Sequence, residues 1–170
     1  SPNELSKLIS GLTQNVQIAE NASFAFEAHP NSTSLEHLET LFSLGFNRLS
    51  IGVQDISPMI LKAINRNQTK EEVIQVTHQA REIGYKSINY DIIYGLPFQN
   101  ETHIRETIDF VKEMRPDRLA FYAYAHVPWK SKGQRAFTSD DLLSGIEKHK
   151  LKLVGEKLLL DAGYESIAMD

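Results

Sequence analysis

A short pattern recurs along this chain and limits the folds that it can adopt: a glycine, an aromatic residue, two polar residues and then alternating apolar residues. It stands at 45–51, 84–89 and 163–168, and its glycines are 39 and then 79 residues apart. A further copy at 114–121, in which a proline replaces the glycine, divides the longer interval into two. A repeat of roughly 40 residues accommodates one helix and one strand, the unit of an alternating α/β fold.

Helices are expected before the repeated pattern, because a glycine suits the left-handed residue that follows a helix. Thr69 and Glu72 predict a capping box at the start of one helix, and Ser139, followed by two aspartates, predicts the start of the last. The helices are expected at Glu4–Leu12, at Leu35–Phe42, from Ser57, from Thr69 to Ile83, at Ile104–Met114 and from Ser139 through Leu158.

Strands are expected after the same points, where short runs of β-branched and aromatic residues follow the turn residues. The predicted strands are Ser23–Ala28, Leu49–Gln54, Ser87–Tyr94, Leu119–Ala125 and Ser166–Met169. Strands that alternate with helices favour right-handed βαβ units and a parallel sheet. The predicted fold class is therefore α/β, either an arc of a (β/α) barrel or a doubly wound sheet. No GxGxxG motif follows a strand, which disfavours a dinucleotide-binding sheet.

Composition excludes several classes of partner and site. The net charge of −4 gives no electrostatic reason to bind nucleic acid or an anionic membrane surface. No apolar run approaches the roughly 20 residues of a membrane-spanning helix, and the first residues lack the order of a secretory signal, so we expect a cytoplasmic location. The chain has no cysteine, so its own thiolates hold no iron–sulfur cluster, and no metal site is predicted.

Polar side chains stand at the carboxyl ends of the first four predicted strands: Glu27 and His29, Gln54, Asp91, and His126. The carboxyl ends of parallel strands build the functional site of a barrel, so we expect these groups to meet at one rim. Asp91 lies inside the apolar run SINYDIIYGLP. A buried charge costs several kcal/mol unless it is paired or hydrogen-bonded, so Asp91 is expected to have a partner.

Alternation along the second strand assigns its residues to two faces. Leu49, Ile51 and Val53 are expected to face the helices, whereas Ser50 and Gly52, with Gln54, face the interior of the arc. By the same alternation Glu27 and Asp91 also face inward. The inner face is therefore expected to be small and polar, with room for a ligand.

Other interpretations of the same residues stay open. Asp91 fits a structural ion pair with Arg66 or Arg48, and Glu27 with Asp91 fits an acid/base pair. Arg66 also fits a solvated residue at a helix end, and Gln54 a residue that hydrogen-bonds a loop. His29 and His126 stand beside prolines, as turn residues do, and the histidines show no metal-ligand spacing.

Four segments together carry a resemblance to a known family: GFNRLSIGVQD, INRNQT, REIGYKSINYDIIYGLPFQ and PDRLAFYAYAHVP. They resemble the oxygen-independent coproporphyrinogen III oxidases, which are radical S-adenosylmethionine (SAM) enzymes, from about Ser23 to Met169. A haem-chaperone-like paralogue is similar over the GVQ segment. Asp55, the pair Asn65-Arg66 and the segment 124–128 are closer to the oxidases.

The resemblance implies a reaction and a set of binding residues. The family converts two propionates of coproporphyrinogen III to vinyl groups through a 5′-deoxyadenosyl radical, which arises when a [4Fe–4S] cluster reduces SAM. Two SAM molecules are implied. By the resemblance, Glu27 contacts the cluster-bound SAM, and Gln54, Arg66, Asp91 and the backbone of Ala125 contact the second. The implied partners are a tetrapyrrole substrate and an electron donor for the cluster, with no nucleic acid and no membrane.

The chain departs from the family pattern in several respects. His29 stands where the family usually has an acid, in EAHP rather than EVDP, and the CxxxCxxC loop of the family is absent. We therefore expect residues 1–170 to be the central part of a radical SAM barrel, roughly its third to seventh strands, inactive alone. The parent is expected to be a monomer, and its fragment is expected to self-associate through open sheet edges.

Two other classes remain as alternatives. One is the haem-binding chaperone, a binding module that resembles the oxidase but does not carry out its reaction. The other is an unrelated aldolase-like barrel, which needs a lysine inside a strand; Lys86, at the entrance of the third strand, is its only candidate.

Overall fold

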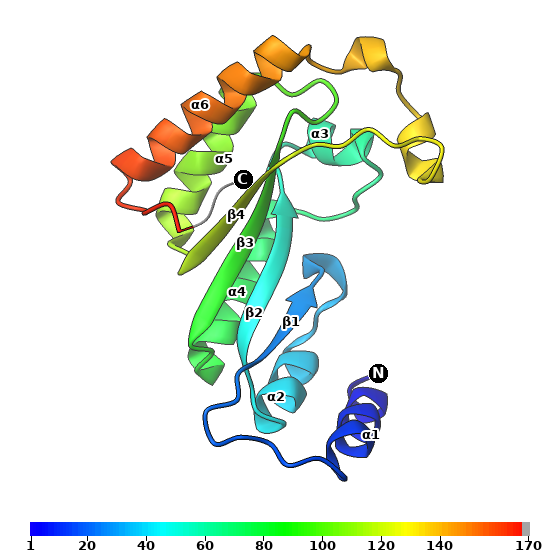
Figure 1. The fold of residues 1–170 in the computed structure, drawn as a ribbon, viewed down its shortest axis with the longest axis vertical. Coiled ribbons are helices and arrows are strands. Elements are labelled where there is room, and N and C mark those ends of the chain that lie inside the picture. Colours follow the sequence, from blue (N-terminus) through cyan, green and yellow to red (C-terminus); the bar gives the residue numbers. More distant parts are fainter. Residues whose placement is uncertain (168–170) are drawn as a thin grey trace.

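The structure is a computed structural model that describes residues 1–167. Four strands form one parallel sheet in chain order (Figure 1): β1 (Phe24–Ala28), β2 (Phe46–Gln54), β3 (Ser87–Tyr94) and β4 (Arg118–Ala123). Each strand therefore pairs with the next in sequence, as in an arc of a barrel and unlike a doubly wound sheet, whose order reverses. The predicted α/β class with parallel strands is confirmed.

Six α-helices connect and cover the strands. They are α1 (Pro2–Thr13), α2 (Leu35–Ser43), α3 (Pro58–Ala63), α4 (Lys70–Ile83), α5 (Glu101–Met114) and α6 (Gly145–Asp161). Three short 3₁₀ turns are η1 (Pro30–Ser32), η2 (Lys132–Arg135) and η3 (Ser139–Asp141). No helix of the described residues is long and apolar enough to cross a membrane.

The predicted helix boundaries are confirmed where local signals set them. Gly45 and Gly84 have φ angles of +92° and +108°, in the left-handed region that a residue after a helix adopts. At the third junction Arg115 takes this conformation itself, directly before Pro116. The Thr69 hydroxyl accepts from the Glu72 backbone N–H, and the Glu72 carboxylate accepts from the Thr69 N–H, which completes the predicted capping box.

The start of the last helix was predicted wrongly. Ser139 opens only the turn η3, which is capped by Thr138, and α6 begins at Gly145. The stronger start signal is Ser144, whose hydroxyl accepts from the Glu147 N–H while the Glu147 carboxylate accepts from the Ser144 N–H.

Two predicted strands also differ from the observed ones. The fourth strand ends at Ala123 rather than at Ala125, because the chain turns into the loop before η2. Ser166 and Ile167 lie in no strand, and Ala168 and Met169 of the predicted fifth strand lie outside the described residues.

One face of the sheet packs on the helices and forms the core, together with side chains of α2, α4 and α5. The strand residues that face the helices are at most 2% exposed: Leu49, Ile51, Val53, Ile88, Tyr90 and Ile92. Tyr90 shares a hydrogen bond of 2.6 Å with the Thr77 hydroxyl on α4, and burial raises the pKa of Tyr90 to about 12. Complete burial of one such side chain contributes about 1.5–3 kcal/mol.

Candidate functional site

The face of the sheet opposite the helices is the inner face of the arc, and it carries a shallow hollow of about 410 Å³. Residues from all four strands line it, with Ile167: Ala25, Glu27, Arg48, Leu49, Ser50, Ser87, Asn89, Asp91, Arg118, Leu119, Ala120 and Tyr122. Ser50, Asn89 and Asp91 are half-buried, whereas their strand neighbours Ile51, Ile88 and Ile92 are buried against the helices. The alternation predicted from the sequence is confirmed.

Asp91 has protein partners on this face. Its two carboxylate oxygens accept from the Ser50 hydroxyl at 3.0 Å and from the Asn89 side-chain amide at 2.8 Å. The same amide donates to the Ser50 hydroxyl at 2.9 Å, and Ser50 pairs with Asn89 in the sheet register. Asp91 is therefore not a member of a direct ion pair with Arg66 or Arg48. A carboxylate has about four lone-pair positions, so it can still accept from a ligand.

Arg66 reaches the inner face from the segment between α3 and α4. Its guanidinium donates to the Gly52 carbonyl and, through Nε at 2.7 Å, to the Gln68 side chain. Gln68 is buried and donates to the Val53 carbonyl at 2.7 Å. Burial lowers the pKa of Arg66, and the charge of Asp91 opposes that shift. Arg66 is thus a fixed part of the rim, not a solvated helix-end residue.

The absence of a side chain at Gly52 leaves space for the side chains of Arg66 and Gln54 beside β2. A Cβ at position 52 would lie 2.6 Å from Arg66 Nη2 and 3.0 Å from Gln54 Nε2. Gly52 pairs with Asp91 in the register, and the register then shifts so that Gln54 pairs with Ile92. Gln54 has a φ of +68°, which turns the chain at the end of β2. Gln54, Arg66 and Asp91 are therefore brought together around one glycine.

The remaining two predicted residues lie at the two opposite edges of the sheet, one on β1 and one after β4. Glu27 is exposed, lines the same hollow as Asp91 and pairs with Ser50 in the register. Ala125 lies in the loop after β4, where its carbonyl accepts from the Gln134 side chain at 3.3 Å. Lys148 of α6 donates to the carbonyl of the preceding residue, Tyr124, at 3.0 Å, which fixes this loop at the end of β4.

His29, at the carboxyl end of β1, has a buried Nδ1 atom without a hydrogen-bond partner among the described residues. Burial lowers the pKa of His29, the charge of Arg66 lowers it further, and Glu72 opposes both. Burial and the charge of Arg66 therefore favour the neutral form of the imidazole.

Sequence reasoning missed a buried link between the ends of β2 and β3. Gln99, which is 2% exposed, donates to the Asp55 carboxylate at 2.7 Å and accepts from the Gly95 and Leu96 N–H groups. The second Asp55 oxygen accepts from the Ser57 N–H at 2.7 Å. Burial raises the pKa of Asp55, and these hydrogen bonds oppose the shift. Asp55 and Gln99 each lie in a segment that carries the family resemblance, but no sequence pattern indicates that the two side chains meet.

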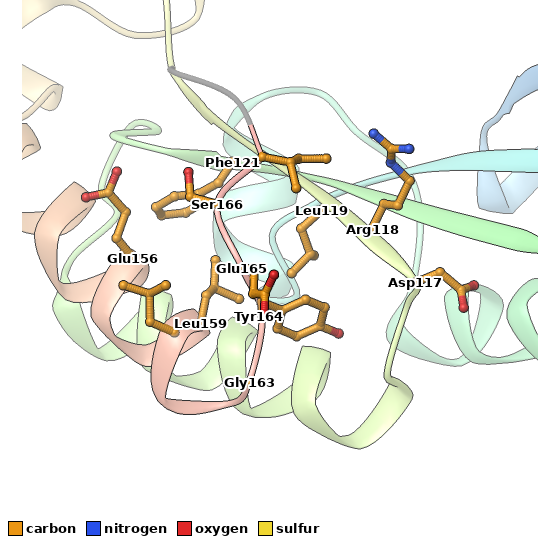
Figure 2. Close-up of a pocket in the computed structure, with 12 residues that line it drawn as sticks. Asp117, Arg118, Leu119, Phe121, Glu156, Leu159, Gly163, Tyr164, Glu165 and Ser166 are labelled. Atoms are coloured by element: carbon orange, nitrogen blue, oxygen red, sulfur yellow. The ribbon is translucent and has the colours of Figure 1, made fainter.

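A larger hollow of about 600 Å³ lies between β4 and α6 (Figure 2). Its walls include the apolar side chains of Leu119, Phe121 and Leu159, and its acidic residues are Asp117, Glu156 and Glu165. None of the predicted site residues lines this hollow, so it is not the candidate site.

Comparison with known proteins identifies the fold of this site. The sequence model of the radical SAM superfamily matches residues 4–111, more than half of the chain. The chain belongs to the radical SAM superfamily. Its four parallel strands and their connecting helices are therefore part of a radical SAM barrel, as predicted.

Several curated relatives of this radical SAM chain are oxygen-independent coproporphyrinogen III oxidases. The Escherichia coli K12 protein is 38% identical over 169 residues, which are 98% of this chain and 36% of that relative. The Cereibacter sphaeroides anaerobic coproporphyrinogen III oxidase 1 is 36% identical over 170 residues, which are 100% of this chain and 38% of that relative. The chain thus spans little more than a third of the length of these relatives.

A solved structure agrees with the sequence comparison. The coproporphyrinogen III oxidase of Escherichia coli, described as a radical SAM enzyme, matches with a TM-score of 0.95 at 36% identity. The match covers 100% of this chain and 39% of that chain. The resemblance stated from the sequence motifs is confirmed, and it extends over α1 as well as the strands.

Proposed function

We propose that this chain, residues 1–170, is the central part of a coproporphyrinogen III oxidase of the oxygen-independent type. The full-length protein converts two propionates of coproporphyrinogen III to vinyl groups by oxidative decarboxylation and yields protoporphyrinogen IX in haem biosynthesis. The observation that carries the proposal is 36–40% identity to curated oxidases along essentially the whole chain, together with the matching fold.

The chain's own residues in this proposal bind SAM at the inner rim. The residues around Gly52 suit a nucleoside that bears an amino acid: the Arg66 fork fits its carboxylate, and the Asp91 carboxylate accepts from ribose hydroxyls. A side chain at position 52 would fill the space that Arg66 and Gln54 occupy beside the strand. Gln54, Arg66, Asp91 and the backbone of Ala125 hold one SAM molecule, and Glu27 contacts another.

The iron–sulfur cluster of the family takes its ligands from elsewhere in the full-length protein. This chain has no cysteine, and its described residues contain no group of three histidine, aspartate or glutamate side chains that could hold a metal ion. When bound, SAM and the cluster supply the radical chemistry. The part described here supplies binding, orientation and a wall that excludes water.

The same proposal names the surroundings of the enzyme. The tetrapyrrole is the substrate, a reduced protein or small-molecule donor supplies electrons to the cluster, and the parent works as a monomer in the cytoplasm without nucleic acid. The acidic net charge of −4 supports the exclusion of nucleic acid.

Anaerobic turnover of the full-length protein tests the proposal. The protein is reconstituted with iron and sulfide, checked for cluster absorbance, and mixed with coproporphyrinogen III, SAM and a reductant. The expected product, after oxidation for detection, is protoporphyrin IX with two fewer carboxyl groups than the substrate. A cluster-loaded protein that binds haem stoichiometrically and forms no vinyl product would overturn the oxidase assignment.

A further inference from the structure

Two arginines of the inner face have no role in the SAM site. Arg48 on β2 and Arg118 on β4 both line the hollow of about 410 Å³. Neither arginine side chain forms a hydrogen bond or an ion pair with another described residue. Arg118 also lines the edge of the hollow between β4 and α6, and in Figure 2 its side chain extends away from Tyr164 and Leu159.

The sheet register places the two arginines on either side of β3. Arg48 pairs with Ser87, and Arg118 pairs with Asn89. Neighbouring strands are about 4.8 Å apart, and Ser87 and Asn89 are two residues apart along β3, so the two arginine Cα atoms are separated by about 12 Å. Only the short Ser87 and Asn89 side chains lie between them on this face. Two long guanidinium side chains can therefore reach one ligand group above β3.

Acidic and basic side chains both line the inner face. The arginines occupy the amino half of the strands, and Glu27 pairs with Ser50, two residues beyond Arg48. Asp91 lies two residues beyond Asn89, about 7 Å further toward the carboxyl rim. Asp91 cannot neutralise the arginines without leaving its hydrogen bonds with Ser50 and Asn89. A ligand whose carboxylates lie at the end away from Asp91 therefore matches this face.

We propose that Arg48 and Arg118 form a carboxylate subsite that holds a propionate of the tetrapyrrole while it reacts. This inference rests on the proposed function and deepens it by naming two substrate-binding residues. A guanidinium binds a carboxylate through two parallel hydrogen bonds, and two arginines that flank β3 can hold one propionate together or two separately. Glu27 and Asp91 repel propionates and so direct the acidic edge of the substrate toward the arginines.

Titration of the full-length protein with coproporphyrin III, the fluorescent oxidised form of the substrate, tests the subsite. Arg48→Gln and Arg118→Gln are each expected to raise the Kd about tenfold. Arg118→Lys is expected to raise the Kd less, because lysine keeps the positive charge and loses only the paired N–H donors of the guanidinium. In turnover, KM is expected to rise with kcat nearly unchanged. The matched control is Arg105→Gln, an exposed α5 arginine paired with Glu101, which is expected to leave the Kd unchanged.

The outcomes separate this inference from the proposed function. Wild-type turnover with a coproporphyrin Kd that stays within twofold in both glutamine variants overturns the subsite and leaves the oxidase assignment intact. A wild-type protein that neither turns over nor binds the tetrapyrrole overturns the assignment, and the subsite with it. If Arg48→Gln fails to fold, the coproporphyrin Kd of Arg118→Gln, at an exposed position, tests the subsite alone. An unchanged SAM affinity of that variant shows that the rim is intact.

Discussion

Alternate residues of β2 and β3 lie in two different environments. On the helix side, Ile51 and Ile88 are 0% exposed and belong to the hydrophobic core. On the inner side, Ser50 and Asn89 are half-buried and form a hydrogen-bonded group with Asp91. The same strands therefore provide stability on one face and present polar groups on the other.

The comparison explains how the sheet tolerates a polar inner face. Burial of the helix side stabilises the strands by several kcal/mol, so the inner side can carry charges that add little to stability. Substitutions on the two faces are therefore expected to separate folding from binding.

The largest effect is expected on the helix side. Ile51→Ala removes buried methyl groups from a fully buried position and is expected to lower the free energy of unfolding by about 2–5 kcal/mol. Urea unfolding of the full-length protein, followed by circular dichroism, measures it. Its matched control is Ser50→Ala, on the other face of the same strand, which is expected to cost less than about 1 kcal/mol. Equal losses for the two variants would remove the distinction between the faces.

The next effect tests the buried link that holds the two strand ends together. Gln99→Leu leaves the Asp55 carboxylate and the Gly95 and Leu96 N–H groups without their partner, and it is expected to cost about 2–3 kcal/mol. Thermal or urea unfolding measures the loss. Gln75→Leu, at an exposed position of α4, serves as the control and is expected to change stability by less than about 0.5 kcal/mol. A neutral Gln99→Leu would show that the link contributes nothing to the fold.

A smaller change in stability with a clear change in binding is expected at Gly52. Gly52→Ala displaces the flexible ends of Arg66 and Gln54, so it is expected to cost only about 1 kcal/mol and to weaken SAM binding about tenfold. The control is Gly11→Ala, where an added Cβ meets nothing within 4 Å and helix propensity favours alanine by about 1 kcal/mol. Unaltered SAM affinity in Gly52→Ala would argue against a binding role for this cluster.

The smallest effect is a pH dependence from His29. Its folded pKa is lowered, so the unfolded chain takes up a proton first, and stability is lost as the pH falls below the ordinary histidine value of about 6.5 toward the folded value. His29→Gln is expected to flatten this part of the stability–pH curve, measured by urea unfolding between pH 5 and 8. His149→Gln, at an exposed position, is the control and is expected to keep the wild-type slope. The same slope in His29→Gln as in the wild type would show that His29 does not cause the pH dependence of stability.

Much of the fold could be predicted because its signals are local. The glycines at 45 and 84, the Thr69 capping box and the two-residue alternation each act within a few neighbouring residues. The start of α6 was predicted wrongly from Ser139, because the local signal that begins the helix is the capping box of Ser144 and Glu147.

The site was less predictable because it depends on contacts between distant residues. Alternation placed Ser50, Asn89 and Asp91 on one face, but their hydrogen bonds follow from the strand register, which no local pattern sets. The register shift before Gln54 and the Asp55–Gln99 link arise in the same way. The binding roles of the rim residues came from resemblance to a family, and their binding of SAM stays a prediction.

Calorimetric titration of the full-length, cluster-loaded protein with SAM tests the central claim most directly. The wild type is predicted to bind two SAM molecules, and Asp91→Asn is predicted to weaken one of them at least tenfold while stability changes little. The matched control is Asp109→Asn, an exposed α5 residue paired with Lys112, which is predicted to bind as the wild type does. An Asp91→Asn protein with wild-type stoichiometry and affinity would show that the inner rim does not hold SAM.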